Sequence, residues 1–164
     1  MAITGFMGVG KSSVARHLSQ LLGCSRLDLD REIEHREGRR INEIIDSRGI
    51  EQFRRLETAV LDDVLRHSAA PIISLGGGTW TVPENRDLIA AAGVLTIWLE
   101  SSFEHCWYNI RDSATDRPLA RDKEKAKRLF DERRAVYGLA DWHLVVRPSF
   151  TSLDVARQIA DAYL

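Results

Sequence analysis

Gly5-Phe6-Met7-Gly8-Val9-Gly10-Lys11-Ser12, close to the start of the sequence, is the stretch that decides the fold. It matches the whole pattern G-x4-G-K-[ST]; a short apolar run precedes it and a helical pattern follows it. Glycines in such a loop let backbone N–H groups curl around phosphate oxygens, and the following helix presents its positive end to the same phosphates. The stretch therefore predicts a P-loop that binds ATP and Mg²⁺.

Two side chains of this loop have predicted chemical roles. Lys11 would neutralise charge near the β- and γ-phosphates, and the Ser12 hydroxyl would bind Mg²⁺. No Asn-Lys-x-Asp segment of the kind that reads guanine is present, which disfavours a GTPase. The predicted nucleotide contacts within the loop are Gly8, Val9, Gly10, Lys11, Ser12 and Ser13.

Outward from the loop, strand-like apolar runs alternate with helical patterns. The expected strands cover residues 3–4, 27–29, 72–75, 94–99 and 144–146, with a long helix at 49–67. This alternation indicates an α/β fold of three layers, α/β/α, around a central parallel sheet, in one domain covering 1–164. Ligands of such sheets bind at the carboxyl ends of the strands, so the loops after the first three strands should carry the chemistry.

Helix starts are also marked in the sequence. Val14, Leu18, Leu21 and Leu22 recur at helical spacing after the loop. Thr81 with Glu84, Ser101 with Glu104 and Thr151 with Asp154 have the spacing of a capping box, in which a hydroxyl and a carboxylate satisfy free N–H groups of the first turn. We therefore expect helices to begin beside these three pairs.

The overall composition excludes several other classes of protein. The 164 residues are 44% hydrophobic and 29% charged, as in ordinary globular domains. A net charge of −1 argues against a nucleic-acid binder, and no apolar run is long enough for a membrane span. Cys24 and Cys106 lack the CxxC spacing, and the histidines lack the HExxH spacing. With no room for a signal peptide before the loop, we expect a cytoplasmic monomer without zinc or disulfides.

The loops after the second and third strands hold candidate acceptor residues. Asp28 and Asp30 follow the second strand; one could support Mg²⁺ while the other orients, or takes a proton from, an acceptor hydroxyl. The alternative is a pair of helix N-caps. Because strand 72–75 ends without a carboxylate, Asp28 is the best second support for the metal. The glycines Gly76, Gly77 and Gly78 would let the backbone approach a ligand closely, or form a plain turn.

Arginines provide the remaining candidates. Arg54 and Glu57 are neighbours on one helix face, where Glu57 could fix Arg54 as a fork for a carboxylate; the alternative is a surface ion pair. Residues 111–134 hold nine Lys or Arg and six Asp or Glu, a local positive excess. Arg117 in this segment could reach the γ-phosphoryl group from a mobile lid, or lie in solvent.

Taken together, these pieces resemble the shikimate kinase family over essentially the whole chain. The pieces that carry the resemblance are Gly-Phe-Met-Gly-x-Gly-Lys-Ser at 5–12, Leu-Asp-x-Asp at 27–30, Phe-Arg-x-x-Glu at 53–57, Gly-Gly-Gly at 76–78 and Arg-Pro-Leu at 117–119. The resemblance implies transfer of the ATP γ-phosphoryl group to the 3-hydroxyl of shikimate, in aromatic amino acid biosynthesis. It also implies a P-loop NTPase fold like that of the nucleoside-monophosphate kinases, with five parallel strands.

The resemblance further implies roles residue by residue. Lys11, Asp30 and Arg117 would be catalytic, and Ser12 and Asp28 would hold Mg²⁺. A helical region at about 31–60 would bind shikimate, and a lid at about 111–123 would close. The implied shikimate contacts are Asp30, Arg54, Glu57, Gly76, Gly77, Gly78 and Arg133.

Some positions depart from the family pattern. Arg133 precedes Tyr137 by four residues, as a substrate-binding arginine does in the family, but Ala135 replaces the usual proline, which leaves Arg134 as a rival. Arg111 is the candidate for the arginine that stacks on adenine, although it lies about a turn closer to the lid than usual. A first strand of two or three residues is shorter than the family implies. A gluconate kinase or a non-catalytic sensor of shikimate or nucleotide would be the alternatives.

Overall fold

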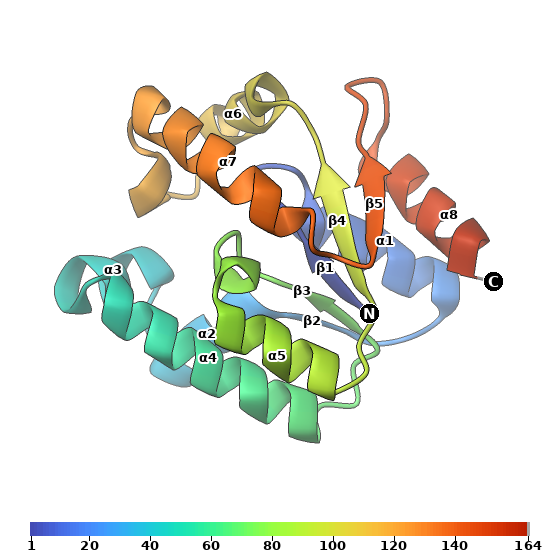
Figure 1. Cartoon of the computed structure of the whole chain (residues 1–164), viewed down its shortest axis with the longest axis horizontal. Helices are drawn as coiled ribbons and strands as arrows, with labels where there is room; N and C mark the ends of the chain where they lie inside the picture. The colour runs from blue at the N-terminus through green and yellow to red at the C-terminus, as the bar shows by residue number, and fades with distance from the viewer. Residues whose placement is uncertain (164) are drawn as a thin grey trace.

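A five-stranded parallel sheet forms the centre of the computed structural model, which describes residues 1–163 (Figure 1). The strand order is β2-β3-β1-β4-β5, and every neighbouring pair is parallel. The strands are β1 (Ala2–Thr4), β2 (Arg26–Asp28), β3 (Ile72–Ser74), β4 (Thr96–Glu100) and β5 (Trp142–Val145). The expected sheet is thereby confirmed.

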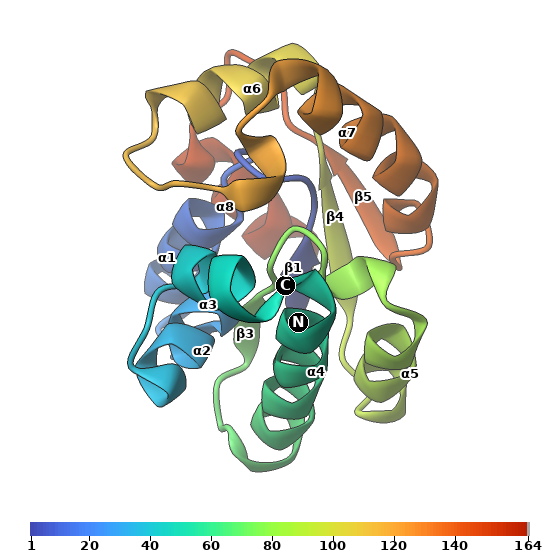
Figure 2. The same ribbon diagram turned by 90° about the vertical axis from the view of Figure 1, so that its left-hand side faces the viewer.

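Helices cover both faces of this sheet, as Figures 1 and 2 show. Helices α1 and α8 pack against each other on one face, while α4 and α5 pack together on the other, so the molecule has the predicted three layers. The helices are α1 (Lys11–Leu22), α2 (Leu29–Glu37), α3 (Ile41–Arg48), α4 (Ile50–His67), α5 (Pro83–Ala91), α6 (Phe103–Asp112), α7 (Lys123–Tyr137) and α8 (Ser152–Tyr163), with the 3₁₀ turns η1 (Thr79–Thr81) and η2 (Pro118–Ala120).

Strand β1 is short but lies at the centre of the sheet. Ala2 and Ile3 are fully buried and pair with β3 on one side and β4 on the other. Helix α1 covers this part of the sheet with Val14, Ala15 and Leu18, whose spacing of one and three positions keeps them on one helix face. The three-residue β1 matches the three-residue β3 beside it, so the P-loop after β1 starts from a paired and buried strand.

Two details of local structure differ from what the sequence pattern suggests. Leu29 is not in the second strand: it is the first residue of α2, where it is fully buried, and Asp28 caps that helix by accepting a hydrogen bond from the Arg31 N–H. Leu21 has helical spacing but is 45% exposed, because the buried stripe of α1 ends at Leu18. Helical spacing alone therefore does not define the width of the buried face.

One of the three expected helix starts has the predicted cap, and the other two do not. At α8 the prediction is confirmed, because Thr151 and Asp154 exchange capping hydrogen bonds. At α6 the cap is Ser102, which accepts from the His105 N–H, while the Ser101 hydroxyl donates to the carbonyl of Val146. At α5, Pro83 takes the first helical position, and within residues 1–163 no side-chain capping hydrogen bond is made at the N-cap residue Val82. The hydroxyl predicted for this cap, that of Thr81, donates to Gly78 instead.

The register of the strands brings three loops to one edge of the sheet. Ser74 of β3 pairs with Asp28 of β2 on one side and with Ile3 of β1 on the other, so these strands end at nearly the same level. The segment 113–122 between α6 and α7 reaches over this edge toward α3, as Figure 2 shows. Among the described helices, none is long and apolar enough to cross a membrane.

Candidate active site

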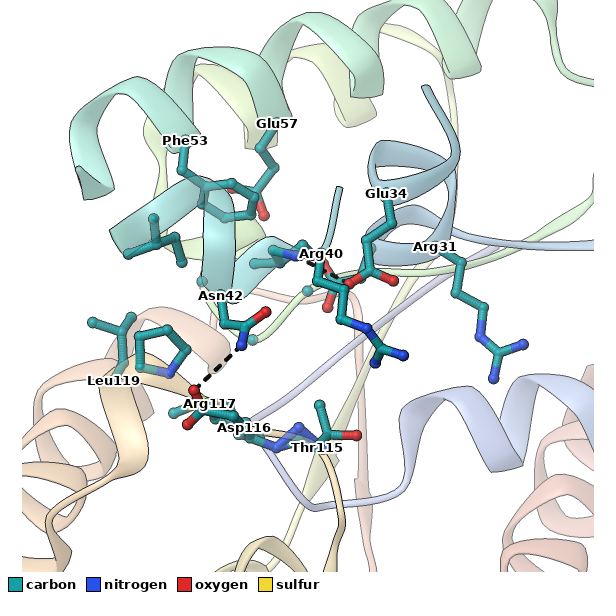
Figure 3. Close-up of a pocket in the computed structure, with 18 of the residues that line it drawn as sticks. Arg31, Glu34, Arg40, Asn42, Phe53, Glu57, Thr115, Asp116, Arg117 and Leu119 are labelled. Atoms are coloured by element: carbon teal, nitrogen blue, oxygen red, sulfur yellow. Dashed lines mark hydrogen bonds between the residues drawn. The ribbon is translucent and has the colours of Figure 1, made fainter. Parts of the chain in front are cut away.

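A cavity of about 850 Å³ opens at the carboxyl ends of β1, β2 and β3. Side chains from α2, α3, α4 and the segment 113–122 converge on it in Figure 3. The structure places most of the predicted site residues in its wall: Ser12, Asp28, Asp30, Arg54, Glu57, Gly76, Gly77, Gly78, Arg117 and Arg133. The site residues that come from distant parts of the sequence are therefore brought together.

The P-loop has the backbone shape that its glycines allow. Gly5, Gly8 and Gly10 all have positive φ, and a Cβ atom on Gly8 would lie only 2.4 Å from the carbonyl oxygen of Cys106 in α6. The side chain of Asn109, also in α6, donates a hydrogen bond of 2.8 Å to the Gly8 carbonyl. Helix α6 thus holds the loop in place from outside.

Lys11 folds back over the loop. Its ammonium group donates to the carbonyls of Gly5 at 2.8 Å and Phe6 at 3.0 Å, so it lies inside the curve where phosphates bind in a P-loop. Burial lowers the pKa of Lys11 to about 8, although the neighbouring Asp30 favours the charged form. An anionic phosphate there would favour the charged ammonium further.

Ser12 and Asp28, the two predicted metal ligands, are in direct contact. The Ser12 hydroxyl donates to the Asp28 carboxylate at 2.5 Å, and the Ser74 hydroxyl donates to the same carboxylate oxygen at 3.0 Å. A hydroxyl and a carboxylate are the hard oxygen ligands that Mg²⁺ prefers, usually with water and phosphate oxygens completing the shell. The donor set therefore fits Mg²⁺, even though Asp28 also caps α2 as in the alternative interpretation.

Asp30 faces the cavity from the first turn of α2. Its carboxylate lies against Gly76, where a Cβ atom would be 2.7 Å from Oδ1. The pKa of Asp30 is raised to about 7, first by burial and then by the nearby carboxylates of Glu57 and Asp28, against the opposing effect of Lys11. A carboxyl group with such a pKa can take up a proton near neutral pH, as a general base must.

Glu57 holds the side chain of Arg54 in place. The Arg54 guanidinium donates to Glu57 Oε2 at 2.7 Å, and the fully buried Glu57 also accepts from the Thr79 hydroxyl at 2.6 Å. Gly78 leaves room for the guanidinium, since a Cβ atom there would lie 2.0 Å from Arg54 Nη2. The ion pair is therefore part of the cavity wall and differs from the surface pair of the alternative interpretation.

Arg133 and Arg134 point in different directions. Arg133 is only 8% exposed and lines the cavity, where burial lowers its pKa. Arg134 is paired at 2.8 Å with Glu100 outside the cavity. The hydroxyl of Tyr137, beside Arg133, donates to the carbonyl of Gly77. The geometry thus favours Arg133 over its rival as a candidate ligand of the substrate.

The two arginines proposed to contact the nucleotide differ as well. Arg117 lines the cavity, and its Nε is buried without a hydrogen-bond partner among the described residues. Burial lowers the pKa of Arg117, while Asp30 opposes this effect. Arg111 is exposed in the last turn of α6 and does not line the cavity. The structure thus brings Arg117 into the wall of the cavity, whereas a role for Arg111 at the adenine, away from this cavity, stays a prediction.

Several residues that support the site were not predicted from the sequence. Ser74, Thr79 and Asn109 each hold a predicted site residue through a hydrogen bond, yet none belongs to a motif. For Ser74, the position at the end of a strand next to the glycines was an available signal. Thr79 and Asn109 carried none, because their partners are distant in the sequence.

Phosphoryl transfer needs an anion-binding loop on one side and a fixed acceptor on the other. The P-loop, which carries Lys11 and lines the cavity with Met7 and Ser12, provides the first. Asp30 and two arginines that suit an anionic acceptor provide the second. The fold and the cavity together define a P-loop kinase of small molecules.

Comparison with known proteins narrows this class. The family model described as "Shikimate kinase" matches residues 7–163. A shikimate kinase of Streptococcus thermophilus is 37% identical over 96% of both chains, and one of Geobacter metallireducens is 41% identical over 85% of this chain and 78% of the relative. The structure of the Acinetobacter baumannii shikimate kinase in complex with shikimate superposes with a TM-score of 0.89 at 30% identity, covering 99% of this chain and 90% of that one. The chain belongs to the shikimate kinase family.

Proposed function

We propose that this chain transfers the γ-phosphoryl group of ATP to the 3-hydroxyl of shikimate, giving shikimate 3-phosphate and ADP. One observation carries the proposal: Arg54, held by the buried Glu57 under Gly78, lies in the same cavity as Asp30 and the P-loop. An acceptor that has both a carboxylate and a hydroxyl group fits this pairing. Its carboxylate would meet Arg54 and Arg133, and its hydroxyl would meet Asp30.

Asp30 orients the hydroxyl and accepts its proton as the new O–P bond forms. Its raised pKa, about 7, suits this task because burial and the carboxylates of Glu57 and Asp28 favour the protonated form of Asp30. The bond from the γ-phosphorus to the bridging oxygen breaks, and ADP leaves with that oxygen. The proton passes from the acceptor to Asp30 and then to solvent.

Lys11 and Arg117 neutralise the charge of the transferred group. Lys11 approaches from the P-loop side and Arg117 from the segment 113–122, so two cations can face the equatorial oxygens. The buried Nε of Arg117 has no hydrogen-bond partner among the residues that the structure describes, so it can donate to an anion. The P-loop residues Gly8, Val9, Gly10 and Ser13 supply backbone N–H groups to the phosphates, and Arg111 is proposed to contact adenine.

Mg²⁺ would be held by Ser12, with Asp28 supporting it, and would add positive charge at the phosphates. The predictions of a cytoplasmic location and a monomeric state stay predictions.

An assay of ADP release tests the proposed function. The protein is incubated with ATP and Mg²⁺ together with shikimate, with gluconate, or with no acceptor. We expect release of ADP only with shikimate. Release with gluconate and not with shikimate would point to the alternative kinase and refute the proposal. Tight shikimate binding without any turnover would instead support a sensor.

A further inference from the structure

Arg121 joins the segment 113–122 to helix α3 across the mouth of the cavity. Its guanidinium donates to both oxygens of Asp46 in α3, at 3.0 and 3.3 Å. It also donates to both oxygens of Asp116 within the segment, at 2.6 and 3.0 Å. Asn42 of α3 adds a hydrogen bond of 3.3 Å to Asp116, which Figure 3 shows as a dashed line. We call Asn42, Asp46, Asp116 and Arg121 the latch.

The geometry of the latch is unusual for a surface contact. An isolated pair of exposed side chains contributes little, because water and salt compete with it. Here one guanidinium makes a two-bond fork with each of two carboxylates, which is the strong form of the interaction. The side chains of Arg121, Asp46 and Asp116 are about half exposed, so dissolved salt should weaken the latch but not abolish it.

The latch acts next to a residue of the site. Asp116 directly precedes Arg117 in the sequence, and the side chain of Arg117 enters the cavity with its Nε unpartnered among the described residues. Because that Nε has no partner to hold it, the position of the guanidinium depends on where the backbone of the segment lies. Arg121 itself does not line the cavity. Its removal therefore deletes no side chain of the cavity wall, although it frees the carboxylate of Asp116, which lines the cavity.

From these contacts we propose that Arg121 is a positioning residue that latches the segment 113–122 onto α3 and so holds Arg117 over the cavity. The latch favours the closed arrangement before any ligand binds. Once ATP and acceptor are bound, their own contacts with Arg117 also hold the segment closed. The latch therefore affects the affinity for the acceptor more than the rate of the saturated enzyme.

Hydrogen exchange of the ligand-free protein tests the latch without any assay of activity. Arg121→Ala should speed exchange of the backbone amides of 113–122 by about fivefold, because exposed ion pairs contribute modestly to holding the segment closed. The matched control is Arg66→Ala, which removes a pair of 2.8 Å with Asp62 on the outer surface of α4. Equal exchange of the segment in the wild type, Arg121→Ala and the control would overturn the proposal.

A kinetic cycle tests the positioning role; this arm alone rests on the proposed function, because it uses shikimate as acceptor. Arg121→Ala should raise the KM for shikimate by about fivefold and change kcat by less than about twofold. Asp46→Ala combined with Arg121→Ala should be no worse than Arg121→Ala alone, since both remove the same contact. A fall in kcat without a change in KM, or losses that multiply in the double variant, would overturn the proposal. If the wild-type protein is inactive with shikimate while Arg121→Ala speeds hydrogen exchange as expected, only the proposed function is refuted.

Discussion

Replacing Asp30 by asparagine should make the ligand-free protein more stable while it removes most of the activity. Burial and two neighbouring carboxylates raise the pKa of Asp30 from its usual 3.8 to about 7, so the folded protein destabilises the ionised form. One unit of pKa corresponds to about 1.36 kcal/mol, which gives an upper limit of about 4 kcal/mol at neutral pH and above. Asparagine has nearly the same shape and no charge, so it should escape this penalty.

The gain should be smaller than the limit for two reasons. The ionised Asp30 attracts the ammonium of Lys11, and the variant loses that attraction. Water in the cavity also reaches the partly exposed carboxylate and stabilises its charge. We therefore expect a gain of about 2 kcal/mol at pH 8, or a rise in Tm of about 4–8 °C for a chain of this size.

The gain in stability should increase as the pH rises. The folded-state pKa of Asp30 is raised, so the stability linked to its proton is complete below pH 3.8 and is lost as the pH rises through about 7. The asparagine variant does not titrate there. Its advantage over the wild type should thus be less than about half as large at pH 5 as at pH 8.

Thermal unfolding of both proteins at the two pH values measures this difference. Asp87→Asn, an exposed carboxylate on α5, is the control for a simple loss of charge. Turnover with shikimate should fall by about 100-fold or more in Asp30→Asn while ATP binding is kept, because a general base contributes about that much. A variant of equal or lower Tm at pH 8, or one whose advantage is the same at both pH values, would refute the electrostatic reasoning.

Three further predictions concern the walls of the cavity. Arg54→Ala should raise the KM for shikimate by about 100-fold and the KM for ATP by much less, since a charge-assisted fork contributes about 1.5–3 kcal/mol. Equal increases of both KM values in steady-state kinetics would contradict the role assigned to Arg54. Gly78→Ala should also weaken shikimate binding, measured by calorimetry, because its methyl group meets the Arg54 guanidinium at 2.0 Å; unchanged affinity would show that Arg54 can move freely. Arg117→Ala should lower kcat by about 1,000-fold, as for other arginines that reach a transferred phosphoryl group. A single-turnover rate close to that of the wild type would exclude contact between Arg117 and the phosphoryl group.

Local patterns predicted the parts of this molecule that depend on neighbouring residues. The P-loop is a short continuous motif, and the strand–helix alternation follows from hydrophobic spacing that needs no knowledge of the rest of the chain. The pairing of Arg54 with Glu57 was also predictable, because three positions on a helix bring two side chains to one face. The burial of that pair was not predictable from the sequence, because it depends on Thr79 and Gly78, which belong to another part of the chain.

Where the prediction failed, the choice was made by tertiary contacts. Ser101 and Ser102 are adjacent hydroxyls, and either could cap α6 by its chemistry. The Ser101 hydroxyl bonds instead to the carbonyl of Val146 beyond β5, which leaves the cap to Ser102. The latch lay beyond the reach of sequence reasoning in the same way, because Arg121 and Asp46 are 75 positions apart and belong to no motif.

The wall formed by Gly76 and Gly78 has a consequence for inhibitors and for resistance to them. The space that a side chain would need at either glycine is already occupied by the enzyme's own Asp30 and Arg54. A mutation that placed a methyl group there to repel an inhibitor would first push away the residues proposed to hold the acceptor. A compound that rests on this backbone should therefore leave the organism few ways to escape by substitution at these two positions without loss of the enzyme.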